Sequence, residues 1–191
     1  PLHLEPEAVV LYHAHGLYTN QVKLVQNIAA QIPPGVLLYV KDHPHDHGYR
    51  SADDYLALKS VPNIRLLDAS ISGKQVVAHS QGVITLTGTA GFEALLLGKK
   101  VFTFGKTFYS LAPGVVYVHH VRDLREQLYA ALDRPATPDA ALYPYLSAYM
   151  RALHPGMTDY FAGRATRYGL DLQENARTVA RGLLSTLRAA P

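Results

Sequence analysis

The chain has 191 residues, of which 48% are hydrophobic and 17% charged, so it can bury one good core but hardly two independent ones. Because it contains no cysteine, disulfides, thiolate metal sites and cysteine nucleophiles are excluded. Its net charge of +3 comes from scattered basic residues, a pattern that argues against nucleic acid and suits a small anionic ligand such as a phosphate ester.

Apolar, β-rich runs alternate with segments of helical spacing along the chain. This alternation is typical of a parallel sheet covered by helices, so the predicted fold class is α/β. The predicted helices cover residues 20–31, 51–61, 73–79, 89–97 and 124–132, and the predicted strands cover residues 36–40, 63–67, 83–86, 101–104 and 115–118.

Residues 1–132 are expected to form one parallel-sheet domain, and residues 133–191 a helical extension that packs on it. Residues 2–7 are typical of a loop that leaves a strand, so the first strand of this sheet is expected upstream of Pro1 and the chain is interpreted as a fragment. No apolar run approaches the roughly 20 residues of a membrane helix, and no secretory leader is visible. These features favour a cytoplasmic protein with at most peripheral membrane association.

In a parallel sheet, ligands bind beyond the carboxyl ends of the strands, where helix N-termini direct their free N–H groups outward. Residues 87–93 join a predicted strand to a predicted helix and contain Thr87, Gly88 and Thr89. This stretch could cradle a phosphate. Alternatively, it is an N-capped turn whose glycines only permit tight packing.

A second polar stretch, Lys41 to Pro44, follows the first predicted strand. His43 could donate an imidazole N–H to a phosphate oxygen, and Lys41 would add positive charge. Alternatively, His43 closes a loop on a backbone carbonyl. His45 and His47 alternate with His43, which permits a metal site, but a turn rich in Asp and Gly is the stronger interpretation, and we predict no metal.

A third stretch, Gly105 to Tyr109, follows the next strand. Tyr109 could stack on a base or close the pocket, or it could simply pack in the core. Glu93, one turn into the preceding helix, could accept hydrogen bonds from a sugar hydroxyl, or it could only favour the positive helix start. Motifs of P-loops, dinucleotide sites, serine hydrolases and zinc proteases are absent from the sequence.

Taken together, these stretches resemble the capsule polysaccharide biosynthesis family of bacterial proteins with a glycosyltransferase-B-like plan. The resemblance covers residues 1–132 and rests on four segments: Pro-Leu-His-Leu-Glu-Pro-Glu at residues 1–7, Tyr-Val-Lys-Asp-His-Pro at 39–44, Thr-Leu-Thr-Gly-Thr-Ala-Gly-Phe-Glu-Ala-Leu at 85–95 with Gly98 and Lys99, and Phe-Gly at 104–105 with Tyr109.

The resemblance implies the Rossmann-like, donor-binding C-terminal half of a two-domain transferase, with relatives that use CMP-Kdo. By this likeness, the nucleotide-sugar would contact Lys41, His43, Pro44, Thr87, Gly88, Thr89, Glu93, Gly105 and Tyr109. The acceptor half is absent, so His43, His3 and Glu5 are the local catalytic candidates, with Glu7 on the same loop. Asp42 stands where many relatives have Glu.

The function that this resemblance implies is a CMP-sugar-dependent glycosyltransferase in capsule or surface glycan assembly, acting in the cytoplasm at the inner face of a bacterial membrane. It would need no cofactor, because the helix N-terminus, His43 and Lys41 can stabilise a phosphate leaving group. Its expected partners are the nucleotide-sugar, a glycan or glycolipid acceptor and the missing acceptor domain. The alternatives are a non-catalytic nucleotide- or sugar-binding module and an enzyme resembling the UDP-sugar 2-epimerases.

Overall fold

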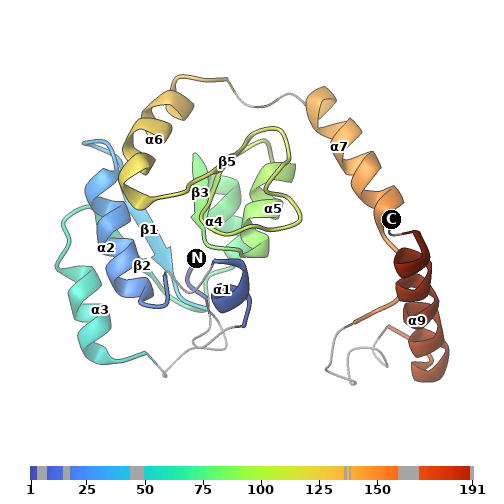
Figure 1. Ribbon diagram of the computed structural model, residues 1–191. Coiled ribbons are helices and arrows are strands. Elements are labelled where there is room, and N and C mark those ends of the chain that lie inside the picture. Colours follow the sequence, from blue (N-terminus) through green and yellow to red (C-terminus); the bar gives the residue numbers. More distant parts are fainter. Residues whose placement is uncertain are drawn as a thin grey trace. The chain divides into compact units, whose positions relative to one another are not determined.

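The computed structural model describes residues 1–3, 8–14, 18–43, 50–135, 137, 139–158 and 168–189. The chain divides into two compact units, Pro1–Leu142 and Tyr143–Pro191. The candidate site lies wholly in the first unit, shown in blue to yellow in Figure 1.

The strands of the first unit are short and parallel. Strands β1 (Leu38–Lys41) and β2 (Ile64–Leu67) pair with each other, and β3 (Gly82–Thr85), β4 (Lys100–Thr103) and β5 (Val115–Tyr117) form a second group in that order. In register, Leu38 lies opposite Ile64, Gly82 opposite Lys100, and Val101 opposite Val115. Each strand therefore ends at the same edge of its group.

Helices connect β1 to β2, β2 to β3 and β3 to β4, as is usual for parallel strands, whereas a loop over residues 104–114 connects β4 to β5. Up to residue 132, the described helices are α1 (Ala8–His13), α2 (Gln21–Gln31), α3 (Ala52–Lys59), α4 (Gly73–His79), α5 (Thr89–Leu96) and α6 (Leu124–Leu132), the last preceded by a 3-10 turn over Val121–Asp123. Local chemistry sets several starts: the Asn20 side chain accepts a hydrogen bond from the Lys23 N–H, and that of Ser51 accepts one from the Asp54 N–H.

Helix α2 holds the two strand groups together. Its Val22, Val25 and Ala29 pack with Val40 and Ile64 around β1 and β2. On an adjacent stripe, Leu24 and Ile28 join a second cluster that contains residues of β4 and α6, among them Phe102 and Leu124. Helix α2 thus contributes apolar side chains to both hydrophobic clusters, because its apolar residues recur at helical spacing on more than one face.

The predicted α/β class is confirmed, and most element bounds shift by only one or two residues. Two differences stand out. The sequence analysis did not predict α1, whose sequence Ala-Val-Val-Leu-Tyr-His has no strong helical pattern. The predicted single sheet also occurs as two hydrogen-bonded groups, because none of the described strands pairs with both β1 and β3.

The second unit is helical, as predicted for the C-terminal extension. It contains most of α7 (Asp139–Ala152) and all of α9 (Leu172–Ala189). The Asn175 side chain bonds the backbone N–H and carbonyl of Met157 at 2.8 and 2.9 Å. The packing of this extension on the sheet domain stays a prediction. Among the described helices, none combines the length and apolarity required to cross a bilayer.

Candidate functional site

The loops that leave β1, β3 and β4 lie at one rim, and the N-terminal residues bridge the first two. The Leu2 N–H donates to the Lys41 carbonyl at 2.8 Å, at the end of β1. The next residue, His3, reaches the loop after β3, where its Nε2 accepts the Thr87 N–H at 3.4 Å. The segments around residues 41 and 87, although distant in sequence, are therefore brought together at this rim.

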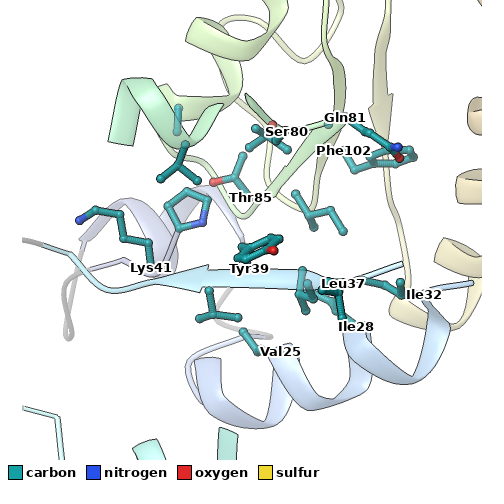
Figure 2. Close-up of a pocket in the computed structure, with 18 of the residues that line it drawn as sticks. Val25, Ile28, Ile32, Leu37, Tyr39, Lys41, Ser80, Gln81, Thr85 and Phe102 are labelled. Carbon is teal, nitrogen blue, oxygen red and sulfur yellow. The ribbon is translucent and has the colours of Figure 1, made fainter. Parts of the chain in front are cut away.

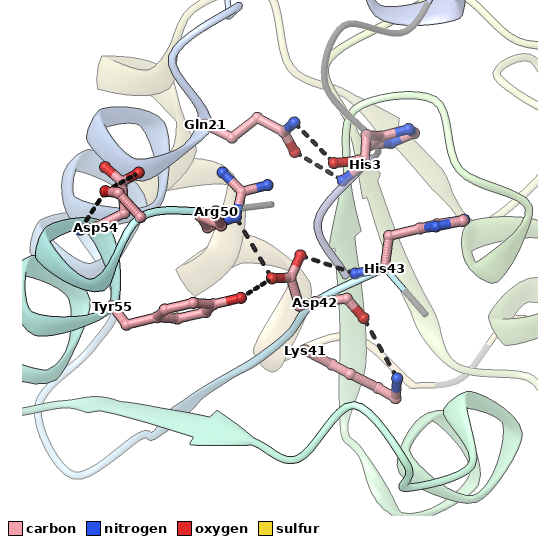
Figure 3. A network of polar contacts seen from close by, with 9 residues as sticks. His3, Gln21, Lys41, Asp42, His43, Arg50, Asp54 and Tyr55 are labelled. Atoms are coloured by element: carbon pink, nitrogen blue, oxygen red, sulfur yellow. Dashed lines mark hydrogen bonds and ion pairs between the residues drawn. The ribbon is translucent and has the colours of Figure 1, made fainter. Parts of the chain in front are cut away.

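His3 is a fixed, buried member of the rim. Its N–H donates to the Gln21 side-chain oxygen at 2.7 Å, and the Gln21 amide donates back to the His3 carbonyl at 3.1 Å (Figure 3). Because Nε2 accepts the Thr87 N–H, the neutral ring carries its proton on Nδ1. A general base needs an unprotonated nitrogen open to its substrate. The geometry therefore favours a positioning role, and the predicted base role of His3 stays untested.

A buried polar cluster under the rim fixes the backbone of His43. Asp42 accepts the His43 N–H at 2.9 Å and the Tyr55 hydroxyl, and Arg50 Nε lies 3.5 Å from the same carboxylate. The side chains of Arg50 and Asp42 are only 3% and 7% exposed, so water screens this pair weakly. Figure 3 shows the His43 side chain extending away from Arg50 and Tyr55, on the same side as His3.

Lys41 contributes positive charge under the rim while it is itself held by carbonyls. It is buried, and its Nζ donates to the Ala69 carbonyl at 2.9 Å and to the Asp42 carbonyl at 3.3 Å. These contacts use two of the three donors of an ammonium group. Lys41 can therefore influence a ligand at the rim through the electrostatic field of its charge and through at most one further hydrogen bond.

The loop from β3 to α5 has the geometry of an anion site. The Thr85 hydroxyl accepts the Gly88 N–H at 3.1 Å, and a Cβ at Gly88 would stand 2.9 Å from that oxygen. Gly88 is the N-cap of α5 and has no side chain to cap the first turn. The Gly91 N–H already donates to the Gly88 carbonyl at 3.0 Å, so among the described contacts the amides of Thr89 and Ala90 are the ones left to solvent or a ligand, with the positive end of the helix dipole behind them.

The side chain of Thr87 adds a second, independent observation. Thr87 is buried, and within the described structure its hydroxyl oxygen has no hydrogen-bond partner. A buried hydroxyl without a partner costs about 1–3 kcal/mol. A ligand atom at the rim could supply the missing bond.

The loop after β4 supports this site from beneath. The Gly105 N–H donates to the Leu86 carbonyl at 2.7 Å, and a Cβ at Gly105 would stand 2.3 Å from the Thr87 methyl group. Tyr109 donates its hydroxyl to the Gly88 carbonyl and is fully buried. Burial raises the pKa of the Tyr109 phenol to about 12, an effect that side-chain hydrogen bonds from Thr107 and Thr103 oppose. Tyr109 thus positions the start of α5, and its ring face is covered by protein.

The remaining predicted site residues divide into two groups. Thr89 is exposed at the first position of α5, and Glu93 lies partly buried on the next turn. Glu5, Glu7 and Pro44 fall outside the described residues, as do His45 and His47 of the metal alternative. The described part of the chain contains no group of three or more potential metal ligands.

Sequence reasoning missed three residues of the rim and gave a fourth, Asp42, no role beyond its place in the family motif. Gln21 and Thr85 gave no signal, because an amide at a helix start and a threonine at a strand end are common. Asp42 directly follows a strand, a position that could have marked it. His13 also reaches the rim, where its Nδ1–H donates to the Lys106 carbonyl at 3.0 Å.

Comparison with known proteins gives three findings. A family model described as "Capsule polysaccharide biosynthesis protein" matches residues 1–153. A stretch of 93 residues is 29% identical to Protein FixF of Sinorhizobium fredii, and this match covers 48% of the chain and 21% of FixF. The chain therefore spans about a fifth of the length of that relative. No solved structure matches the chain.

Proposed function

The chain belongs to the capsule polysaccharide biosynthesis family, and from this membership in a family of surface polysaccharide synthesis we propose that it binds the activated sugar donor of a glycosyltransferase. The donor in this proposal is CMP-Kdo or a similar CMP-linked acidic sugar. Its phosphate would lie at the start of α5, within the rim formed by the loops after β1, β3 and β4.

The observation that carries this proposal is the buried Thr87 hydroxyl beside the uncapped start of α5. A phosphate oxygen there would accept hydrogen bonds from the Thr87 hydroxyl and from the unbonded N–H groups at the start of the helix. The helix dipole would stabilise the charge of the phosphate. Glycine at positions 88 and 105 lets the loop backbones pack closely at this site, because a Cβ atom at either position would collide with Thr85 or Thr87.

Positive charge on the opposite side of the rim supports the same ligand. His43 follows β1 directly, and Asp42 holds its backbone. In sugar transfer, negative charge grows on the departing phosphate, and groups already directed at that position lower the barrier without rearrangement. We assign His43 to this phosphate as a hydrogen-bond donor and Lys41 as a nearby field charge.

The choice of a CMP-sugar rests on the resemblance of His43-Pro44 and of Thr87-Gly88-Thr89 to motifs that hold the nucleotide in CMP-sugar transferases. In that comparison the Glu93 carboxylate would accept a hydrogen bond from a hydroxyl group of the sugar donor. The acceptor would be a glycan or glycolipid, and a further domain would supply its site and the general base, with Glu5 as the local candidate.

Titration calorimetry of the chain with CMP, UDP and GDP tests the donor directly. We expect CMP to bind at least about tenfold more tightly than UDP or GDP, a difference of about 1.4 kcal/mol. Equal affinities, or no binding of any of the three, would contradict the proposal.

Substitutions at the rim test where the phosphate lies. Thr87→Val keeps the shape and removes the hydroxyl, so CMP affinity should fall by about tenfold, whereas cytidine, which lacks the phosphate, should bind equally to both forms. His43→Ala should act in the same direction. Thr19→Val, at an exposed threonine before α2, is the matched control and should leave binding unchanged.

Transfer assays distinguish the proposal from its alternatives. A preparation that contains both the chain and the acceptor domain should move sugar from the CMP-donor to a glycan. A non-catalytic module would bind CMP without transfer in the same assay. An epimerase would instead bind UDP-sugars and exchange the C2 proton with solvent.

A further inference from the structure

One side of helix α9, the dark red helix in Figure 1, is packed within the second unit. The Asn175 side chain bonds the backbone of Met157, and a Cβ at Gly182 would stand 2.9 Å from the His154 side chain. Thr186 Oγ1 lies 3.1 Å from Nε2 of the same histidine. Asn175, Gly182 and Thr186 are spaced by seven and four residues, so they lie on one side of α9, and that side is covered.

The adjacent side of α9 is apolar and exposed. From the first residue of the helix onward, apolar residues recur every three or four positions, as they do on one face of an amphipathic helix. Leu172 is 51%, Leu183 63% and Leu187 71% exposed, and the two alanines between them are also exposed. The five residues, which we call the apolar face of α9, are Leu172, Ala176, Ala180, Leu183 and Leu187.

Three arginines lie along one border of this apolar face. Arg177, Arg181 and Arg188, which we call the basic border, are spaced by four and seven residues and so share one side of the helix. Leu184, which is 52% exposed, lies between them and the apolar face, three residues from Arg181 and four from Arg188. The apolar stem of an arginine can lie on an apolar surface while its guanidinium group stays at the polar boundary.

The basic border can bind an anion other than the one carboxylate that it now contacts. Arg177 Nη1 lies 3.5 Å and Arg181 Nη1 3.7 Å from the Glu174 carboxylate, and all three side chains are more than half exposed. Exposed ion pairs of this kind contribute little to stability. Both arginines can therefore exchange Glu174 for another anion at little cost.

We propose that the apolar face of α9 binds the surface of a membrane that contains anionic lipids, with the helix lying parallel to the membrane plane. The leucines would enter the boundary between head groups and acyl chains, and the basic border would bind lipid phosphate groups. The arginines favour this occupant over an uncharged protein surface, which would offer them no anion. The proposal is independent of the proposed function, because no residue of the rim belongs to α9.

A cavity in the first unit is a second apolar feature that could take up lipid. It has a volume of about 700 Å³, and Figure 2 shows Val25 and Ile28 of α2 on one side of β1 and Tyr39 on the other side. A cavity of this volume holds one small molecule, whereas the apolar face of α9 requires a surface. A monomeric fatty acid therefore distinguishes the two.

Co-sedimentation of the full chain with vesicles tests the proposal. Vesicles of phosphatidylglycerol and phosphatidylcholine in equal parts are compared with vesicles of phosphatidylcholine alone. We expect binding to the anionic vesicles to be at least about tenfold stronger, and to weaken as salt is added, because salt screens the arginine charges. Equal binding to both kinds of vesicle, or binding to neither, would overturn the proposal.

Substitutions on α9 test whether this helix is the contact. Leu183→Gln combined with Leu187→Gln should weaken binding to anionic vesicles by at least about tenfold, because less apolar area is buried. Arg181→Gln should weaken it by about fivefold. The matched controls are Leu111→Gln, at a leucine that is 90% exposed, and Arg122→Gln, at a side chain that is 80% exposed; neither should change binding. Binding that survives both α9 variants would overturn the proposal.

Two further measurements distinguish the other occupants. Decanoate, used below the concentration at which it forms micelles, would fill the cavity, so vesicle binding that it abolishes would place the lipid there and overturn the proposal. The other occupants are the sheet domain, on which this extension is predicted to pack, and a second copy of the chain. Without vesicles, the doubly substituted leucine variant should melt at the same temperature as the parent, as expected for exposed side chains. A lower melting temperature would show that protein covers the apolar face and would also overturn the proposal.

Discussion

At the residue scale, some positions of the rim are packed so closely that a single added methyl group would collide with a neighbouring residue. Gly105 illustrates this, because a Cβ there would meet the Thr87 methyl group at 2.3 Å and the His13 and Leu86 carbonyls at 3.0 Å. Two of these three neighbours are backbone atoms, so they cannot move aside by rotating. The glycine is required by space and not by an unusual backbone angle.

Gly105→Ala should therefore lower the free energy of unfolding by about 2 kcal/mol, the usual cost of an extra methyl group in a packed site. It should also displace Thr87 and weaken CMP binding. Gly73→Ala is the control, because no atom lies within 4 Å of a Cβ at that position at the start of α4. That variant should be as stable as the parent or slightly more so in chemical denaturation.

The buried Asp42 carboxylate leads to a second prediction. Asp42→Asn removes the negative charge that lies 3.5 Å from Arg50 Nε, at a site that is nearly inaccessible to water. Removal of one partner of a buried ion pair costs about 3–5 kcal/mol, and we expect a loss at the lower end because Asn can still bond the His43 N–H. Thermal unfolding measures this loss, and Asp133→Asn, at an exposed aspartate after α6, should not reproduce it.

At the element scale, the start of α5 is held by a residue of another element. Tyr109, in the loop after β4, donates to the Gly88 carbonyl, and its ring lies near Phe92 of α5 and Phe108, with centroid distances of 6.1 and 5.1 Å. The helix start is therefore fixed to the β4 loop by one hydrogen bond and an aromatic cluster.

The Tyr109 phenol should make stability depend on pH in the alkaline range. Its pKa is about 10 in the unfolded chain and about 12 in the folded chain, so only the unfolded state ionises between these values. Stability is unaffected below pH 10 and falls above it, by about 1.4 kcal/mol at pH 11. Denaturant titrations at pH 9 and 11 measure this loss, and Tyr109→Phe should show a loss smaller by that amount.

Element boundaries were largely predictable because local chemistry sets them. Ser51 with Asp53 and Asp54 marks the start of α3, and Gly98, at a φ of +66°, ends α5. The contacts among these elements were less accessible to sequence reasoning. His3, Gln21 and Thr87 meet only because separate strands end at one rim, and no spacing along the chain encodes that meeting. Tyr109 could equally have stacked on a ligand or packed, and only its burial distinguishes these roles.

At the scale of the whole molecule, all contacts described for the rim lie within Pro1–Leu142, the first compact unit. The family match ends close to this unit, at residue 153. A chain that ends at Leu153 keeps every one of these contacts, together with the buried Leu142. We expect it to bind CMP within about twofold of the full chain in calorimetry. A loss of more than tenfold would assign part of the site to residues 154–191.

The aromatic cluster beside α5 also offers a direct optical readout. The sequence contains no tryptophan, so Phe108→Trp would introduce a single indole at a half-exposed position within about 5 Å of Phe92 and Tyr109. Its emission could be excited apart from that of the tyrosines. A nucleotide that orders the first turn of α5 would then change the fluorescence of one chromophore, which would allow stopped-flow measurement of its arrival and departure.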